Sequence, residues 1–292
     1  MRGNANLHEF VAPGKLDAVL ALLACEPGEW TPLAGGTELM VAFSAGRLAA
    51  PKLVSLWSIP DLRAITVTEQ SVAIGAAATF LDLRRNAIIA AEFPLLAKAA
   101  GWIGSIANQS RATLGGNLVN GSPAADSSPA LLAYDAEIEM ISVRGRRRVP
   151  YAQFHTGYKR NVLLPDELVY AIHVPRRFAH HVSYLRKVGT RRAMAIAKVA
   201  LGATAMVDDG AIREIRLGAA SLAPFPARLL QTEAVLLGMP VTPETIALAH
   251  RALLAEIKPI TDIRSTEEYR RRVALNLLDE FLQSLRPEGS RA

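Results

Sequence analysis

Two glycine-rich segments of similar composition interrupt this chain. The first, PLAGGTELM, covers residues 32–40, and the second, NQSRATLGGNLVNGSPAADSSPALL, covers residues 108–132. Tandem glycines allow positive φ and let a ligand approach the backbone closely, and successive backbone N–H groups form a concavity that suits a phosphate. Each segment also carries a hydroxyl and a carboxylate side chain. Together they predict one extended ligand with two phosphates, held from both sides.

Neither segment matches the G-x-G-x-x-G fingerprint of the Rossmann fold or the G-x-x-x-x-G-K-[ST] pattern of the P-loop. These two nucleotide-binding folds therefore lose their main support. The chain has 292 residues, half of them hydrophobic and 21% charged, as in a globular protein with a substantial core. This length predicts one large or two modest domains.

The N-terminal sequence MRGNANLHEF lacks an apolar signal segment. No hydrophobic run reaches the ~18–20 residues that a membrane span needs. We therefore expect a cytoplasmic protein without a membrane span.

The single cysteine, Cys25, excludes a disulfide within the chain and a thiolate-held zinc or iron–sulfur site built by this chain alone. It falls in an expected amphipathic helix, so we expect a buried structural thiol. The histidine spacing predicts no metal site, and the adjacent His180 and His181 are expected to be solvated.

The chain has 33 Lys and Arg against 27 Asp and Glu, a net charge of +6. The densest basic run, RGRRR at residues 144–148, lies between two strand-like stretches without interleaved aromatic residues. This pattern favours a solvated hairpin, followed by a docking face for an acidic partner protein. Binding to nucleic acid, which a basic chain can signal, comes last, and we expect no nucleic-acid partner.

Hydrophobic spacing predicts an α+β organisation with short strands in the first part of the chain. Helices are expected at residues 16–23, 80–86, 94–103 and 130–134. Strands are expected at residues 30–33, 53–56, 65–67, 72–74, 137–142, 147–151 and 167–174, and those at 65–67 and 72–74 form a hairpin.

Composition changes at the basic connector 176–181, where we place a domain boundary. After a strand at 183–187, alternation at 198–207 and 212–222 around the Asp-Asp-Gly turn at 208–210 predicts a hairpin. Helices are expected at 227–237, 243–257 and 266–285, and the last opens with a capping box from Ser265 to Glu268. The C-terminal part is therefore expected to be an antiparallel sheet backed by helices.

The motif A-G-G-T-E-L-M, followed by T-L-G-G-N-L-V-N-G-S-P-A-A-D, resembles the FAD-binding (medium) subunit of the molybdenum hydroxylases, the family of xanthine dehydrogenase and carbon monoxide dehydrogenase. Three further segments resemble this family in the same order: residues 154–175, 184–196 and 259–272. The resemblance covers nearly the whole chain.

The resemblance implies a two-part FAD-binding domain of the vanillyl-alcohol-oxidase (PCMH) type at residues 1–176, with two subdomains that split near 52–60. A smaller C-terminal domain of the CO dehydrogenase flavoprotein type would cover residues 177–292. FAD would lie between the parts of the first domain.

By similarity, the first glycine segment would wrap the diphosphate and part of the ribityl chain with Pro32, Leu33, Ala34, Gly35, Gly36, Thr37, Glu38 and Leu39. The second would contribute Thr113, Gly115, Gly116 and Asn117 from the other side. Asp126 would accept hydrogen bonds from hydroxyls of the cofactor.

Val169 would lie near the flavin ring and Lys187 near the same pocket, and Ile103 stands where some relatives carry an aromatic residue against the cofactor.

Each of these roles has an alternative. Asp126 could cap the following helix, Lys187 could be a surface charge, and Val169 could belong to the ordinary core. Glu38 could bond the backbone amides of its own loop.

The family's function implies an oxidoreductase subunit that relays electrons, with no catalytic side chains of its own. FAD would take electrons from [2Fe–2S] clusters of a small partner chain, which receives them from a large molybdopterin-binding chain, and pass them to NAD, oxygen or a quinone. Such trimers commonly pair into a dimer of heterotrimers. The alternatives are a stand-alone FAD-dependent oxidoreductase that acts on a small molecule, and a non-catalytic nucleotide-binding or assembly subunit.

Overall fold

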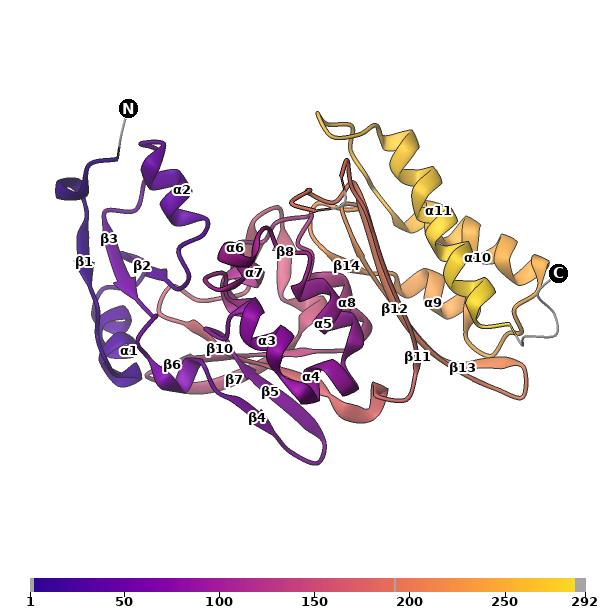
Figure 1. Cartoon of the computed structure of the whole chain (residues 1–292), viewed down its shortest axis with the longest axis horizontal. Coiled ribbons are helices and arrows are strands. Elements are labelled where there is room, and N and C mark those ends of the chain that lie inside the picture. The colour runs from indigo at the N-terminus through magenta and orange to yellow at the C-terminus, as the bar shows by residue number, and fades with distance from the viewer. Residues whose placement is uncertain (1–2, 192, 287–292) are drawn as a thin grey trace.

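The computed structural model describes residues 3–191 and 193–286. Figure 1 shows three units in chain order, with the N-terminal unit at the left, a central unit and a C-terminal unit at the right. The chain is a mixed α and β protein, as expected.

The N-terminal unit is a three-stranded parallel sheet in the order β1-β3-β2, with helices at its sides. Its elements are η1 (Ala5–Leu7), β1 (Glu9–Val11), α1 (Leu16–Cys25), β2 (Trp30–Leu33), α2 (Leu39–Ser44) and β3 (Lys52–Ser55). The apolar face of α1 packs with Trp30 and Val54 in one cluster. Cys25 is exposed at the end of α1, so the expectation of a buried thiol was wrong.

The central unit contains a five-stranded antiparallel sheet in the order β4-β5-β10-β6-β7. Its strands are β4 (Ile65–Val67), β5 (Ser71–Gly75), β6 (Glu137–Ser142), β7 (Gly145–Pro150) and β10 (Leu168–Pro175), and β8 (His155–Gly157) pairs with β9 (Arg160–Asn161). The two hairpins predicted around residues 68–71 and 143–146 are confirmed.

Short helices cover one face of the central sheet (Figure 1). They are α3 (Phe80–Arg85), α4 (Ala87–Glu92), α5 (Pro94–Ala100), α6 (Ile106–Gln109), α7 (Leu114–Val119) and α8 (Ser128–Ala133), with 3-10 turns η2 (Pro60–Leu62), η3 (Tyr151–Gln153) and η4 (Arg176–Phe178). Three of these, α4, α6 and α7, were not predicted. They are only one or two turns long, and a helix this short shows little periodicity in sequence.

The C-terminal unit is a four-stranded antiparallel sheet, β11-β12-β13-β14, backed by helices. Its elements are β11 (Val182–Val188), β12 (Val199–Asp208), β13 (Ala211–Ala220), β14 (Ala227–Arg228), α9 (Leu230–Leu236), α10 (Pro243–Glu256) and α11 (Glu267–Ser284). The cap of α11 is Thr266, which accepts a hydrogen bond from Tyr269 N, so the capping box placed at Ser265 was wrong.

Helix α8 lies directly against the C-terminal sheet, and all six of its residues are buried. Two strand glycines make this approach possible: a Cβ at Gly202 or Gly218 would lie 2.6 or 2.5 Å from the carbonyl oxygen of Pro129. Helices α9 to α11 cover the opposite face of the same sheet (Figure 1).

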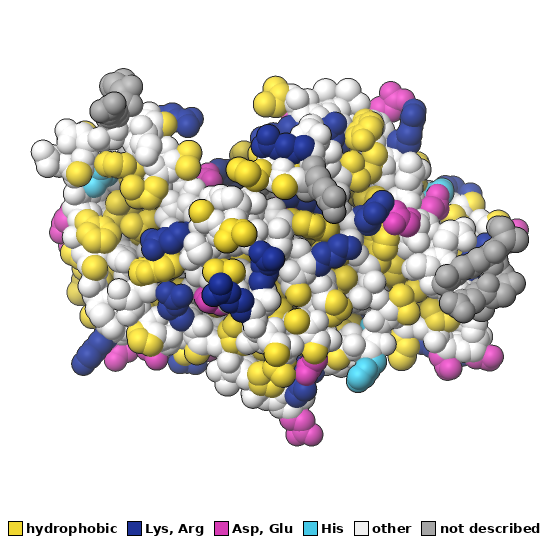
Figure 2. Space-filling model, in the orientation of Figure 1, with side chains coloured by type: hydrophobic (Ala, Val, Ile, Leu, Met, Phe, Trp, Pro, Cys, Tyr) yellow, Lys and Arg dark blue, Asp and Glu magenta, His cyan; other side chains and the backbone are white. Residues whose placement is uncertain are grey.

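The basic run in the β6–β7 hairpin is paired with carboxylates of the same chain. Arg146 and Arg148 donate to Glu139 at 3.2 and 3.1 Å, whereas Arg147 turns the other way, to Glu167, and Arg144 pairs with Asp166. Figure 2 shows other Lys and Arg side chains scattered over the central unit.

His181 Nε2 lies 2.9 Å from Glu214 Oε2, and the His181 side chain is only 7% exposed. The expectation that His180 and His181 are both solvated was therefore wrong for His181. In the part of the chain that the structure describes, no helix is long and apolar enough to cross a membrane.

Candidate functional site

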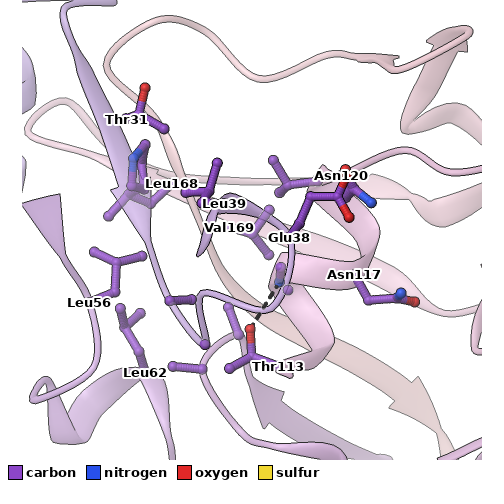
Figure 3. Close-up of a pocket in the computed structure, with 18 of the residues that line it drawn as sticks. Thr31, Glu38, Leu39, Leu56, Leu62, Thr113, Asn117, Asn120, Leu168 and Val169 are labelled. Atoms are coloured by element: carbon purple, nitrogen blue, oxygen red, sulfur yellow. Dashed lines mark hydrogen bonds between the residues drawn. The ribbon is translucent and has the colours of Figure 1, made fainter. Parts of the chain in front are cut away.

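The two glycine segments meet at a cavity of about 530 Å³ between the N-terminal and central units. This volume falls within the ~300–1,000 Å³ of typical ligand sites. Figure 3 shows its walls: Leu56 and Leu62 lie at one end, and Glu38, Asn117 and Asn120 lie at the other. The cavity therefore has an apolar end and a polar end.

The first glycine segment presents unpaired backbone donors. It connects β2 to α2, and Gly36 has φ +75°, a conformation that glycine adopts without strain. Among the described residues, no group accepts a hydrogen bond from the N–H of Gly35, Gly36 or Thr37. Three free amides in succession suit an anionic ligand.

The second glycine segment differs from the expectation of an open loop, because Gly115 and Gly116 lie in the first turn of helix α7. Its cap is Thr113, whose Oγ1 accepts a hydrogen bond from Gly116 N at 3.2 Å. Gly115 N donates to Ala76 O at 2.8 Å. The expectation that these two N–H groups face a ligand was therefore wrong, although both residues line the cavity.

Glycine is needed in α7 for a different reason, which is close packing. A Cβ at Gly115 would lie 2.6 Å from the Cβ of Ala76. A Cβ at Gly116 would lie 2.8 Å from Thr113 Oγ1, and Gly116 is exposed to the cavity. On the side of the cavity formed by α7, a ligand can therefore approach the backbone of the two glycines closely and can contact the polar side chains of Asn117 and Asn120.

The structure brings most of the predicted site residues together. The predicted residues that line the cavity are Pro32, Ala34, Gly35, Gly36, Thr37, Glu38, Leu39, Ile103, Thr113, Gly115, Gly116, Asn117 and Val169. Leu33, Asp126 and Lys187 do not line it. Val169 belongs to the central core and also lines the cavity.

Glu38 is exposed at the start of α2, and its side chain makes no capping hydrogen bond there. Its carboxylate lies 3.8 Å from Lys159 Nζ, at the tip of the β8–β9 hairpin. The alternative in which Glu38 bonds the amides of its own loop has no support in the described contacts.

Asp126 and Lys187 form a buried ion pair beside the cavity. Lys187 Nζ donates to Asp126 Oδ2 at 2.7 Å, and the two side chains are 9% and 12% exposed. The next residue, Ser127, donates to Asn117 Oδ1 at 2.7 Å, which ties the pair to the cavity wall. Helix α8 has no side-chain cap, so Asp126 does not cap it.

The other oxygen of Asp126, Oδ1, is buried and has no partner among the described residues. Burial raises the pKa of Asp126 to about 6, against the opposing effect of Lys187. A buried acceptor without a donor is costly, and a ligand hydroxyl would satisfy it.

Several lining residues were not predicted. Most come from segments distant in sequence from the two glycine segments, although Thr31, Ala112, Val119 and Asn120 lie in or beside them. The full set is Leu23, Trp30, Thr31, Leu56, Leu62, Ala76, Ala77, Ala112, Val119, Asn120, Asn161, Leu163, Leu164, Pro165, Glu167 and Leu168. Most are small or apolar and carry no motif. One member, Asn161, is a polar residue shortly before the predicted strand at 167–174, and its residue type could have suggested a role in binding.

The segment 161–168 is held in place by Arg147. Its guanidinium donates to both oxygens of Glu167, at 2.7 and 2.6 Å, and to Val162 O at 2.7 Å. Glu167 also accepts from Leu164 N at 2.8 Å, and the hydrogen bond from Arg147 holds the pKa of Glu167 below its usual range. One wall of the cavity is therefore fixed by the β6–β7 hairpin.

The residues present fit FAD, the cofactor that the sequence resemblance implies. Free amides at residues 35–37 suit the diphosphate, the unpartnered Asp126 Oδ1 suits a hydroxyl, and the apolar end suits an aromatic ring. Nothing in residues 3–191 and 193–286 gathers three His, Cys, Asp or Glu side chains into a group able to hold a metal ion.

Comparison with protein families gives two matches. Residues 5–177 match the FAD binding domain in molybdopterin dehydrogenase, and residues 184–285 match the CO dehydrogenase flavoprotein C-terminal domain. The two matches together span nearly the whole chain.

Individual proteins agree with these matches. The chain is 33% identical over 240 residues to the xanthine dehydrogenase FAD-binding subunit of Escherichia coli O157:H7, covering 82% of each chain. It is 28% identical over 277 residues to the carbon monoxide dehydrogenase medium chain of Hydrogenophaga pseudoflava, covering 94% of this chain and 96% of that one. The solved carbon monoxide dehydrogenase of that organism superimposes with a TM-score of 0.89 at 28% identity, over 94% and 95% of the two chains.

Proposed function

This chain belongs to the family of FAD-binding subunits of xanthine dehydrogenase and carbon monoxide dehydrogenase, and from this membership we propose that it is the electron-relay subunit of a molybdenum-containing hydroxylase. When bound, FAD would collect electrons from [2Fe–2S] clusters of a partner chain and pass them to an external acceptor such as NAD, oxygen or a quinone. The chain itself would bind and orient the cofactor.

The observation that carries the proposal is the row of free amides at Gly35, Gly36 and Thr37, facing a cavity of suitable size. These N–H groups would hold the diphosphate. Thr113, Gly115, Gly116 and Asn117 would form the opposite wall, and Asp126 would accept from hydroxyls of the cofactor while Lys187 keeps its carboxylate charged.

The remaining predicted residues would have packing roles. Pro32, Leu33, Ala34 and Leu39 would shape the first segment around the cofactor, with Glu38 at its polar end. Val169 and Ile103 would contribute apolar contacts that exclude water.

We also propose the partners and the division of the chain. A large molybdopterin-binding subunit and a small [2Fe–2S] subunit would assemble with this chain, as a dimer of heterotrimers. Its nearly full-length similarity to a chain named as the medium chain of such an enzyme supports this. The boundary at residue 176 and a cytoplasmic location belong to the same proposal.

The test is the visible absorption spectrum of the tagged full-length chain, purified gently from its own source. We expect flavin bands together with broad iron–sulfur absorbance, and two co-purifying chains. Flavin bands from a preparation with one chain would favour the stand-alone oxidoreductase instead. A colourless preparation that fails to take up added FAD would overturn the flavin role and favour an assembly subunit.

A further inference from the structure

The two glycine segments belong to different units, so contacts between the units set the distance between them. The first segment is continuous with β2, in the N-terminal sheet. The second is fixed to the central unit, where Phe80 N donates to Ala112 O and Leu114 N donates to Ala78 O, at 3.1 and 3.0 Å. A cofactor held by both segments requires the two units to keep one separation.

The segments approach each other closely at the backbone of Gly35. A Cβ at Gly35 would lie only 1.8 Å from the carbonyl oxygen of Arg111 and 3.1 Å from Ala112 N. Here two backbones pack without an intervening side chain. Such a contact limits how close the segments can come, but it does not keep them together.

The side chain of Arg111 supplies an attraction across the same boundary. Its Cζ lies 3.8 Å from the ring centroid of Trp57, well within the range of a cation–π interaction. Within the described residues, the Arg111 guanidinium has no hydrogen bond or ion pair, and it stacks on this ring.

Trp57 is rigidly connected to the first glycine segment. It follows β3, where Leu56 N donates to Leu33 O at 2.9 Å, and its own N–H donates to Ser55 Oγ at 3.3 Å. Arg111 therefore meets the N-terminal unit at two points: its carbonyl limits the approach of Gly35, and its guanidinium attracts Trp57. Neither the Arg111 nor the Trp57 side chain lines the cavity.

We propose that Arg111 and Trp57 are positioning residues that fix the separation of the two glycine segments and thereby set the affinity for FAD. This inference rests on the proposed function. A site whose halves are already correctly spaced binds more tightly, because the ligand does not have to order them. Without the stack, only a fraction of molecules would hold the binding-competent spacing, and the apparent affinity would fall by that fraction.

The experiment is a fluorescence titration of the FAD-free full-length chain with FAD. We expect Trp57→Ala and Arg111→Met each to weaken FAD binding about fivefold, the upper end for a cation–π pair whose cation is exposed. The double variant should be no weaker than Trp57→Ala alone, because both changes remove the stack of Arg111 on Trp57. Trp57→Phe, which keeps an aromatic ring, should recover most of the affinity.

Arg63→Met is the matched control. The Arg63 guanidinium lies 4.7 Å from the same ring and also pairs with Asp82, and among the described residues no hydrogen bond or ion pair joins it to either glycine segment. This variant should bind FAD within about twofold of the unaltered chain. Melting curves of all FAD-free variants show whether each is folded, and Arg111→Met changes only an exposed side chain.

Two results would overturn the inference: unchanged FAD affinity in folded Trp57→Ala and Arg111→Met chains, or effects that multiply in the double variant. An equal loss in Arg63→Met would also overturn it, because the ring would then act only on general stability. If the unaltered chain itself bound no FAD, the proposed function would fail first, and this inference with it.

Discussion

At the scale of single residues, the two glycine pairs act by different means. Gly35 and Gly36 have backbone N–H groups that are free at the cavity. The N–H groups of Gly115 and Gly116 donate hydrogen bonds within the protein, and these two residues line the cavity without side chains. The first pair is therefore suited to binding an anion, and the second to admitting a ligand close to a helix.

Gly116→Leu places a bulky side chain in the cavity and against Thr113 Oγ1. We expect the purified variant to retain at most about a tenth of the bound FAD, a loss that corresponds to ~1.4 kcal/mol or more of binding free energy. Bound FAD is measured by absorbance after denaturation. Gly14→Leu is the control, since a Cβ at Gly14 meets nothing within 4 Å. Undiminished FAD in a folded Gly116→Leu chain would contradict the placement of the site.

Asp126 predicts opposite pH dependences for folding and for binding. Its pKa in the folded chain is raised from 3.8 to about 6, so the folded state binds this proton more tightly than the unfolded state. The contribution of Asp126 to the free energy of unfolding is therefore fully present below pH 3.8 and is lost as the pH rises through about 6. FAD hydroxyls should favour the charged carboxylate, so FAD affinity should instead weaken as the pH falls below about 6.

The measurement compares the unaltered chain with Asp126→Asn between pH 5 and pH 8, by FAD titration and by urea unfolding. The variant should lack the pH-dependent part of both quantities, with a change in affinity of up to about tenfold per pH unit in the unaltered chain. Parallel pH curves for the two proteins would mean that Asp126 does not accept from the cofactor.

Motifs and the family resemblance predicted fewer than half of the residues that line the cavity, mainly those in segments whose glycine pairs and short polar side chains carry a recognisable pattern. They did not reveal that Gly115 N is bonded to Ala76, since that acceptor lies in a segment remote in sequence. The apolar walls from Leu56, Leu62 and residues 163–168 were missed for the same reason. In the sequence alone, a leucine that lines a cavity cannot be distinguished from a leucine in a hydrophobic core.

At the scale of elements, α8 is the helix that both sheets share. It follows the Asp126 segment, is buried along its whole length, and rests on Gly202 and Gly218 of the C-terminal sheet. Thr204 Oγ1 donates to Ala133 O at 2.8 Å and fixes the end of the helix to β12.

Gly202→Ala and Gly218→Ala should each destabilise the chain by about 2 kcal/mol, because the new methyl group meets the Pro129 backbone and cannot be relieved by a side-chain movement. Urea unfolding measures this free energy. Gly157→Ala is the matched strand control, since its nearest neighbour atom would lie 3.8 Å away. A shift as large in the control would show that strand glycines matter here for backbone reasons rather than for packing.

The long elements were predictable and the short ones were not. Alternation over ten residues identifies β12 and β13, and the Asp209-Gly210 turn between them has the positive φ that these residue types tolerate. Helix α7 has two glycines in its first turn, and glycine is a poor helix former. The Thr113 cap and tertiary packing stabilise this helix, and neither can be read from the hydrophobic periodicity of the sequence.

At the scale of the whole molecule, Asp135 joins the central unit to the C-terminal sheet. Its carboxylate accepts from Arg177 at 2.9 Å, from Arg216 at 2.6 Å and from Arg228. Arg177 also pairs with Glu214, and Arg228 with Glu233. The network fixes how the two units meet.

Asp135→Asn tests this joint without disturbing the backbone, because asparagine also tolerates the φ of 50° found there. We expect a loss of about 2 kcal/mol in the free energy of unfolding, below the range for fully buried pairs because the Asp135 side chain is partly exposed. Asp208→Asn, which removes an exposed pair with Arg213, should cost less than about 0.5 kcal/mol. Equal losses in the two variants would contradict a special role for Asp135.

The close packing of α8 against Gly202 and Gly218 also limits which domains can be exchanged in evolution. The two family matches, at residues 5–177 and 184–285, correspond to two segments that recombination could exchange separately. However, a foreign C-terminal half would need glycine at both contact positions, a lysine for Asp126 and arginines for Asp135. The two halves are therefore expected to be inherited together, as a single genetic unit.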